Sequence, residues 1–406
     1  MVFMELYGRR SIVAHKILNV ISDSNIGGAG KLLLTFLTNV NREEFDISVV
    51  LPKDSLLTPE IEKINIRTIE IEGIADKSFG IAAVKKLSAL YKEEKPSIVH
   101  THAALSARVA AKLNKLKVVH TRHSVHTSQR LAKEPIYKKK FPYKHLVGAL
   151  NNYLSDTIIA TSPVAKLSMV ETGTNQKKTI MVYNGINGLK PLTEKQRRDC
   201  RAHFGLSDED FVCAIIARLE KVKGIEYILK AAQLLQKEDS SIKILIVGTG
   251  SEEETLRQLE EELELTNVIF TGFVEDVRYI MGMIDLQLNA SHTETTNLAL
   301  LEGLSLGVPA IASDCAGNPF VINDGVNGLL FEENDYVGLS KAILELKGNP
   351  RELQHLGKRA KEIFAEKFDS KVMTRRVEDI YRELIANIEV KESVEESTNE
   401  EIKEEN

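Results

Sequence analysis

Short apolar, β-branched runs alternate with stretches of helical periodicity along most of the chain. This rhythm is typical of parallel sheets that helices cover on both faces. In the first half, strands are expected at residues 16–22, 46–51, 66–71, 98–101, 117–121, 157–161 and 179–183. The expected helices between them are residues 31–39, 81–92, 106–113, 146–155 and 163–172.

A second series of elements follows a polar linker near residues 188–198. Its strands are expected at residues 211–217, 242–248, 268–272, 284–289, 310–313 and 328–331, and its helices at residues 225–236, 252–263, 297–306, 336–346 and 350–388. The predicted fold class is therefore α/β, with two Rossmann-like doubly wound parallel-sheet domains that face each other across a cleft. In such sheets ligands bind beyond the carboxyl ends of the strands.

These elements divide the chain into an N-terminal domain over residues 15–187, a C-terminal domain over residues 188–365 and a last helix over residues 366–388. From Glu389 to Asn406 the chain has eight Glu and two Lys, a net charge of −6, which predicts a disordered acidic tail. The whole chain carries −5, so the remainder sums to about +1 and indicates no nucleic-acid partner.

Three cysteines without metal-ligand spacing fit a reducing compartment. The sequence shows neither a signal peptide nor an apolar run of the ~20 residues that a membrane-spanning helix needs. We therefore expect a cytoplasmic protein. Residues Arg130–Lys144 combine six cations with interleaved aromatic side chains. Such a segment either contacts the anionic inner face of a membrane or forms a solvated loop.

Two glutamates eight residues apart, Glu294 and Glu302, flank the expected start of a helix. Glu302 is expected about a turn and a half into that helix, since ~5 residues rise roughly 7–8 Å. Free N–H groups at the helix start attract phosphate. Carboxylates around a phosphate site suit a sugar nucleotide, although the spacing alone also fits two solvated surface glutamates.

Glycines follow two of the expected strands. Gly27 and Gly28 precede a helix, and Gly248 ends a strand of the C-terminal domain, but neither cluster matches a P-loop or a dinucleotide fingerprint. Arg218 and Lys223 follow the first strand of the C-terminal domain. Together they would neutralise a diphosphate, whereas the alternative is two ordinary surface cations.

Histidines end two consecutive strands of the N-terminal domain: His102 ends one, and Arg122 and His123 end the next. A neutral histidine at this edge is expected to donate a hydrogen bond to a sugar or an acceptor. Zinc is the competing interpretation. No acidic or cysteine partner stands at ligand spacing, so no metal is expected.

These motifs occur in a recognisable order along the chain. Over roughly residues 15–385, the sequence resembles the retaining glycosyltransferases of family 4, which have the two-domain GT-B fold. The most specific part of the resemblance begins with Glu294 and Glu302. It continues over Gly303–Ser313 and Gly317 and ends with Asp324–Leu330. Further matches are Gly27-Gly28, Arg218-Leu219 with Lys223-Gly224, Asn184-Gly185-Ile186 and Thr271–Val277.

The resemblance implies a role for each matching residue. Glu302 would hold the ribose hydroxyls, and Glu294 would contact the transferred sugar. Catalytic roles would fall to His123, Arg218, Lys223 and Glu294. Donor binding would also involve Gly27, Gly28, Gly248, the backbone of Val274, and the N–H groups of Thr296, Asn297 and Leu298, while His102, Arg122 and His123 would lie on the acceptor side.

The family implies transfer of a sugar from a UDP- or GDP-sugar to an acceptor hydroxyl with retention, without a catalytic metal or a permanently bound cofactor. The expected acceptor is a glycan or a lipid-linked molecule on the N-terminal domain, in polysaccharide or glycolipid synthesis. The last helix is expected to cross back onto that domain. One departure is Asn318-Pro319-Phe320, where many members carry Pro-Glu.

Two other functions fit the same architecture. A nucleotide-sugar epimerase would need acid and base carboxylates that reach the sugar carbon. A non-catalytic nucleotide or sugar binder would keep Glu302 and tolerate the loss of Arg218. The family resemblance and the pair of Arg218 and Lys223 favour the transferase.

Overall fold

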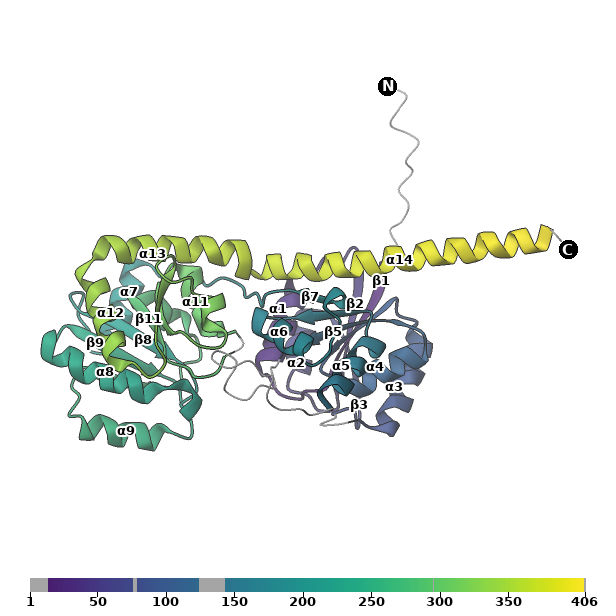
Figure 1. Ribbon diagram of the computed structural model, residues 1–406. Coiled ribbons are helices and arrows are strands. Elements are labelled where there is room, and N and C mark those ends of the chain that lie inside the picture. Colours follow the sequence, from purple (N-terminus) through teal and green to yellow (C-terminus); the bar gives the residue numbers. More distant parts are fainter. Residues whose placement is uncertain (1–13, 76–78, 124–142, 295, 405–406) are drawn as a thin grey trace, which may run out of the picture.

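The computed structural model describes residues 14–75, 79–123, 143–294 and 296–404. Two α/β domains lie side by side (Figure 1). The N-terminal sheet has seven parallel strands in the order β3-β2-β1-β4-β5-β6-β7, and the C-terminal sheet has six in the order β10-β9-β8-β11-β12-β13. The predicted fold class is confirmed.

The N-terminal domain contains every strand that its sequence predicts. Its strands are β1 (His15–Ile21), β2 (Phe45–Pro52), β3 (Arg67–Ile71), β4 (Ile98–His102), β5 (Lys117–Arg122), β6 (Thr157–Ala160) and β7 (Thr179–Met181). Its helices are α1 (Gly28–Asn39), α2 (Thr58–Lys63), α3 (Ile81–Glu94), α4 (Leu105–Leu113), α5 (Tyr143–Leu154) and α6 (Pro163–Glu171).

The C-terminal domain likewise contains all six predicted strands. They are β8 (Phe211–Ile216), β9 (Ile242–Val247), β10 (Val268–Gly272), β11 (Leu286–Asn289), β12 (Ala310–Ser313) and β13 (Gly328–Phe331). Its helices are α7 (Glu194–His203), α8 (Ile225–Glu238), α9 (Glu253–Glu262), α10 (Arg278–Met283), α11 (Leu298–Leu306), α12 (Tyr336–Gly348) and α13 (Pro350–Ile363).

The segment 188–198 is only partly a linker, because α7 begins at Glu194. Thr193 and Gln196 form a capping box in which the Thr193 hydroxyl accepts from the Gln196 N–H and the Gln196 side chain accepts from the Thr193 N–H. This Thr-x-x-Gln signature is legible in the sequence. The polar composition of the segment conceals it.

Each sheet changes strand order beside its first strand. In the N-terminal sheet β1 pairs with both β2 and β4, and in the C-terminal sheet β8 pairs with both β9 and β11. Loops that leave the two central strands run in opposite directions, which opens a crevice at the carboxyl edge. Gly27 and Gly28 follow β1, Lys223 follows β8 and Glu294 follows β11. The strand order therefore gathers the predicted site residues at two crevices.

The chain passes between the domains at two neighbouring points. The Ile186 N–H donates to the Phe368 carbonyl at 3.0 Å, and the Ser370 N–H donates to the Ile186 carbonyl at 2.9 Å. A π-helical turn over Phe364–Phe368 separates α13 from α14 (Ser370–Glu404). Figure 1 shows α13 along the C-terminal domain and α14 along the N-terminal one.

Helix α14 completes the core of the N-terminal domain. Its residues Met373, Val377, Ile380 and Tyr381 pack in one cluster with α1 and β1. Helices α3 and α4 pack in a separate cluster with alternate residues of the same strands, so they cover the opposite face. The helix continues to Glu404, where the sequence predicts a disordered tail. Glu and Lys are good helix formers, and an established helix propagates more easily than it starts.

Candidate active site

Lys223 and Glu294 form an ion pair across the crevice of the C-terminal sheet. Their side chains are only 16% and 12% exposed, and the Ser291 hydroxyl donates to the same Glu294 oxygen at 3.3 Å. The two loops are also joined through their backbones, since the His292 N–H donates to the Val222 carbonyl at 2.8 Å. Two predicted site residues from different loops thus lie in direct contact.

Glycine permits this close approach of the loops. Gly224 has a φ of +61°, and a Cβ there would lie 2.2 Å from the Ala290 carbonyl oxygen. Gly248 has a φ of +130°, and its Cβ would lie 2.0 Å from the Ala217 oxygen. Packing against the segment that leads to Arg218 therefore requires Gly248 whether or not a ligand is bound.

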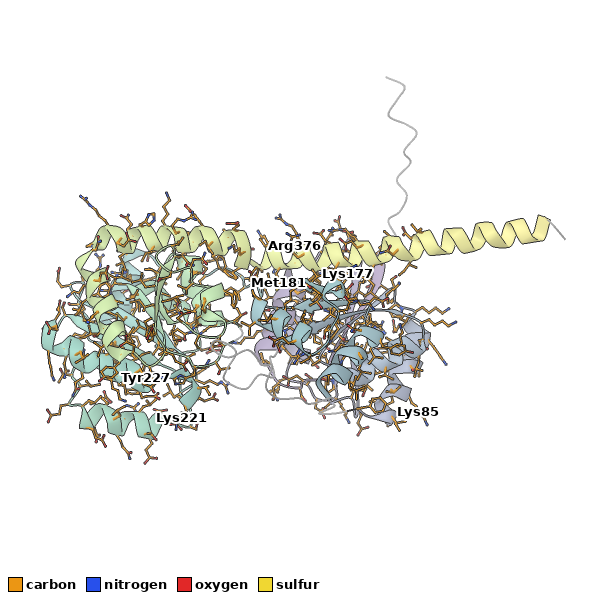
Figure 2. The ribbon with its side chains drawn as sticks, viewed as in Figure 1. Lys85, Lys177, Met181, Lys221, Tyr227 and Arg376 are labelled. Carbon is orange, nitrogen blue, oxygen red and sulfur yellow. The ribbon has the colours of Figure 1, made fainter. Side chains whose placement is uncertain are left out.

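Beyond this loop, the ring of His292 is held from two sides. Its Nδ1 lies 2.7 Å from a carboxylate oxygen of Glu333, and Tyr227 of α8 meets it edge-on with ring centroids 5.7 Å apart. Figure 2 labels Tyr227 and Lys221 on this part of the C-terminal domain. The loop that carries Glu294 is therefore anchored at Ser291 and His292, just before that residue.

Arg218 lies at the rim of this group. Its side chain is 77% exposed, and its guanidinium pairs with Glu220 at 2.5 Å. Surface ion pairs of this kind contribute about 0–1 kcal/mol. Arg218 can therefore leave Glu220 at little cost, but the structure does not place it in the Lys223–Glu294 ion pair.

The start of α11 follows Glu294 directly. Asn297 caps the helix, and its side-chain oxygen accepts from the Ala299 N–H at 3.0 Å. Thr296, Asn297 and Leu298 are all partly accessible. The other N–H groups of the first turn have no intrahelical partner, and the helix dipole favours an anion beside them.

Glu302 lies one turn further along α11. It lines a pocket of about 280 Å³ between the two domains, together with Lys31 and Thr35 of α1, Asn187 of the connection and Leu298. Burial raises the pKa of the Glu302 carboxyl to about 7, and the charge of Lys31 opposes this shift. The carboxyl therefore changes its protonation near neutral pH in the ligand-free protein.

The loop before α1 is open at Gly28. A Cβ at Gly28 would meet no atom within 4 Å, and Gly27 is the N-cap of the helix in an extended conformation. Packing therefore gives no reason for glycine at position 28. The space before this helix start is available to a ligand.

The histidines of the N-terminal domain form a row on the α1 side of the sheet. The rings of His100 and His102 stack with centroids 4.5 Å apart, and those of His102 and His123 with centroids 5.2 Å apart. His102 Nδ1 lies 2.9 Å from His123 Nε2, and His102 Nε2 lies 3.2 Å from the Asn19 side-chain oxygen. The alternation of side chains along a strand places His100 and His102 on one face, so the sequence contained this signal.

The contacts determine which nitrogens carry protons. Burial lowers the pKa of His123 to about 4 and that of His102 well below its usual value, so both rings are neutral. The Asn19 oxygen can only accept, so His102 Nε2 donates to it and His102 Nδ1 accepts from His123 Nε2. His123 Nδ1 is then an acceptor, and it is buried without a partner. The expected hydrogen-bond donor at His123 therefore points into the protein, and the nitrogen left over is an acceptor.

A cavity of about 40 Å³ adjoins this row, between α1, the sheet and α14. Its lining includes His102, His123 and Asn184. This volume is large enough for a water molecule. Arg122 does not line this cavity, since alternation along β5 places it on the opposite face of the sheet; it is partly buried, and burial lowers the pKa of its guanidinium.

Val274 lies apart from these groups. It lines a pocket of about 500 Å³ with Thr271 and Phe273 of its own loop and with residues of α7 and α10.

Lys31, Asn19 and Tyr381 are site neighbours that the sequence did not single out. Of these only Lys31 had a local signal, since it directly follows the glycine cluster before α1.

Over the described ranges, no cluster of three or more His, Cys, Asp or Glu side chains is arranged to hold a metal ion. Residues 130–142 of the basic segment Arg130–Lys144 lie outside the part of the chain that the structure describes.

Two family models match the chain. One, described as glycosyl transferases group 1, matches residues 196–363, and the other, described as glycosyltransferase family 4, matches residues 26–187. The chain belongs to glycosyltransferase family 4. It is a glycosyltransferase of the retaining, hexosyltransferase type with the GT-B fold, as the resemblance predicts.

Relatives of this family 4 glycosyltransferase include N-acetyl-alpha-D-glucosaminyl L-malate synthase of Bacillus anthracis, 27% identical over 76% of this chain and 80% of the relative. Alpha-monoglucosyldiacylglycerol synthase of Acholeplasma laidlawii is 28% identical over 74% of this chain and 79% of the relative. Among solved structures, HepE of Anabaena in complex with UDP has a TM-score of 0.77 at 19% identity, covering 91% of this chain and all of that one.

Proposed function

We propose that this family 4 glycosyltransferase transfers a sugar from a UDP- or GDP-sugar to a hydroxyl of a glycan or lipid-linked acceptor, in the synthesis of cell-surface polysaccharide or glycolipid. One observation carries the proposal: the Lys223–Glu294 ion pair, the start of α11 and Glu302 follow one another along a single wall of the crevice. The Glu294 carboxylate matches the sugar hydroxyls, Lys223 and the free N–H groups match the diphosphate, and the Glu302 carboxyl matches the ribose of a nucleotide sugar.

Structures of similar fold support UDP as the nucleotide, because HepE is described in complex with UDP and with UDP-glucose. One relative named for a diacylglycerol product and another named for a diphosphoundecaprenol-linked acceptor support a lipid-linked acceptor. Both inferences extend from those proteins to this chain by similarity.

The geometry suggests how the transfer proceeds. Lys223 and Arg218 would stabilise the charge that develops on the diphosphate as its bond to the sugar carbon breaks. The acceptor oxygen would bond to the same face of that carbon and pass its proton to a departing phosphate oxygen. Glu294, oriented by Lys223 and Ser291, would hold sugar hydroxyls. His123 Nδ1 would accept a hydrogen bond from a hydroxyl that enters the cleft.

A panel of UDP- and GDP-sugars tests the proposal by thermal shift, because binding to the native state raises the unfolding temperature. We expect a shift with one nucleotide family. Failure of every nucleotide sugar and of free UDP and GDP would exclude donor binding. Incubation with the stabilising sugar nucleotide alone should leave the sugar unchanged, since only an epimerase converts it without an acceptor.

The cytoplasmic location at the inner face of the membrane is part of this proposal, with the basic segment Arg130–Lys144 as one contact. Replacing Lys138, Lys139 and Lys140 with Glu should reduce co-sedimentation with anionic liposomes. Unchanged binding would remove this segment from the contact. None of the helices in the described ranges has the length and apolarity that crossing a bilayer requires.

A further inference from the structure

Helix α5 presents an apolar face to solvent. Leu146, Val147, Leu150 and Tyr153 are 67%, 49%, 40% and 66% exposed. Their spacing places them on one side of a helix. A stripe of this kind normally faces a core, so its exposure requires an explanation.

The orientation of α5 is fixed by contacts on its other side. Gly148 lies so close to Gly173 that a Cβ would be 2.3 Å from the Gly173 backbone. Asn152 donates to the Gly173 carbonyl at 3.0 Å, and Arg108 of α4 donates to Asn151 at 2.7 Å. The apolar stripe cannot turn inward without the loss of these contacts.

The exposed stripe continues onto α4. Leu113, at the end of α4, is 70% exposed, and Lys112 places its Nζ 5.1 Å from the centre of the Tyr153 ring. Lys115 follows and is also exposed. Neither helix contains Asp or Glu. We call Leu113, Leu146, Val147, Leu150, Tyr153 and the adjoining Lys112 the α4–α5 face.

We infer that the α4–α5 face docks on an anionic membrane surface. Leu and Val side chains enter the boundary between headgroups and acyl chains, Tyr prefers that depth, and Lys pairs with anionic headgroups. The one-sided charge of the face favours this partner over a second copy of the chain, whose identical face would repel it. The role of this docking rests on the proposed function, because the enzyme has to reach a lipid-linked acceptor at a membrane.

The position of α5 agrees with this role. The helix belongs to the connection between β5 and β6, which leaves the sheet at the edge where His123 lies. In a parallel sheet such a connection starts at the carboxyl edge and returns to the amino edge. Docking through α5 would therefore attach to the bilayer the connection that begins beside His123.

Flotation with vesicles tests the inference. Full-length protein is mixed with vesicles of phosphatidylcholine alone or with about one third phosphatidylglycerol, and the bound fraction is measured. The wild type should float with the anionic vesicles. Leu146→Ser with Leu150→Ser should weaken that binding about tenfold or more, because two apolar anchors are lost. Lys112→Gln with Lys115→Gln should reduce binding to the anionic vesicles and its sensitivity to salt.

Ile81→Ser provides the matched control, because Ile81 on α3 is 67% exposed but lies outside the α4–α5 face. It should float like the wild type. The stabilisation of every variant by UDP is measured in parallel, so that loss of membrane binding is separated from failure of the proposed donor site. A wild type that floats but binds no nucleotide would refute the proposed function and leave this inference standing.

Three results would overturn the inference. The first is a wild type that stays unbound to both vesicle types under conditions where it is folded, and the second is a double Leu variant that floats as well as the wild type. The third is a wild-type dimer in lipid-free sedimentation that the double variant converts to a monomer, which would assign the face to a second copy of the chain.

Discussion

The hydroxyl of Tyr381 on α14 lies 2.6 Å from Nδ1 of His100 on β4. The two residues are 281 positions apart, and both are fully buried. His100 stacks on His102, which is hydrogen-bonded to His123. The helix that crosses back from the C-terminal domain therefore supports the row that ends at a proposed catalytic residue.

Tyr381→Phe removes this hydrogen bond without removing the ring. We expect a loss of roughly 1–3 kcal/mol in the free energy of unfolding, because His100 Nδ1 is left buried and unpaired. We also expect a lower kcat, with little change in the KM for the donor. Tyr91→Phe is the matched control, since Tyr91 is equally buried but its hydroxyl makes only a 3.5 Å contact with the Ala107 carbonyl. Equal effects of the two substitutions on kcat would contradict the link to His123.

Lys223→Ala should reduce turnover by roughly 10²-fold or more, since it removes a charge aimed at the leaving diphosphate. It also leaves Glu294, which is 12% exposed, without its cation, so a loss of about 1–3 kcal/mol in stability is expected.

Arg218→Ala should reduce turnover and leave stability within about 0.5 kcal/mol, because its side chain is mostly exposed. For both variants, activity assays measure the turnover and chemical denaturation measures the free energy of unfolding.

Lys221→Ala controls for the loss of a nearby positive charge. Lys221 belongs to the same short helical turn as Lys223, is exposed and is labelled in Figure 2. It should retain near-normal turnover. Full activity of Lys223→Ala would remove that residue from the mechanism.

Glu302→Gln should change how stability depends on pH. The folded-state pKa of Glu302, about 7, lies above its ordinary value of 4.5, so the native state binds more protons than the unfolded state between these values. The stabilisation from this protonation is fully present below about pH 4.5 and is lost as pH rises through 7. The variant should therefore resemble the wild type at pH 5 and exceed it above pH 7, by roughly 3 kcal/mol at most.

Thermal unfolding across pH 5 to 8 measures this difference without ligand. Donor affinity is expected to fall in Glu302→Gln, because a neutral amide is a weaker acceptor for ribose hydroxyls than a carboxylate. Parallel pH profiles of the two proteins would show that Glu302 is not the group that titrates.

Gly28→Ala should leave the fold intact and weaken donor binding. A Cβ at this position meets nothing within 4 Å, and alanine is the better residue within a helix. Any loss of affinity would then come from contact with the ligand itself. Gly348→Ala, at an equally open position at the end of α12, should change neither property. Unchanged nucleotide binding in Gly28→Ala would place the diphosphate elsewhere.

The local pattern of apolar, β-branched residues was sufficient to predict the strands. Buried parallel strands appear as short β-branched runs, and all thirteen runs are strands in the structure. Among the α-helices of the described ranges, α2, α7 and α10 were not predicted, and two of these three have only six residues. Helical periodicity needs more than one or two turns to become visible.

The sequence by itself determined the two sheets, the helix start beside Glu294 and the family to which the chain belongs. Only the tertiary structure decided that Lys223 pairs with Glu294 from 71 residues away, that Glu302 shares a pocket with Lys31, and that the proton of His123 points inward. Periodicity is a property of residues that are close together in the sequence, so a short stretch of sequence is enough to recognise it. Ion pairs, pKa shifts and tautomers depend on which strands lie side by side and on how much water their packing removes.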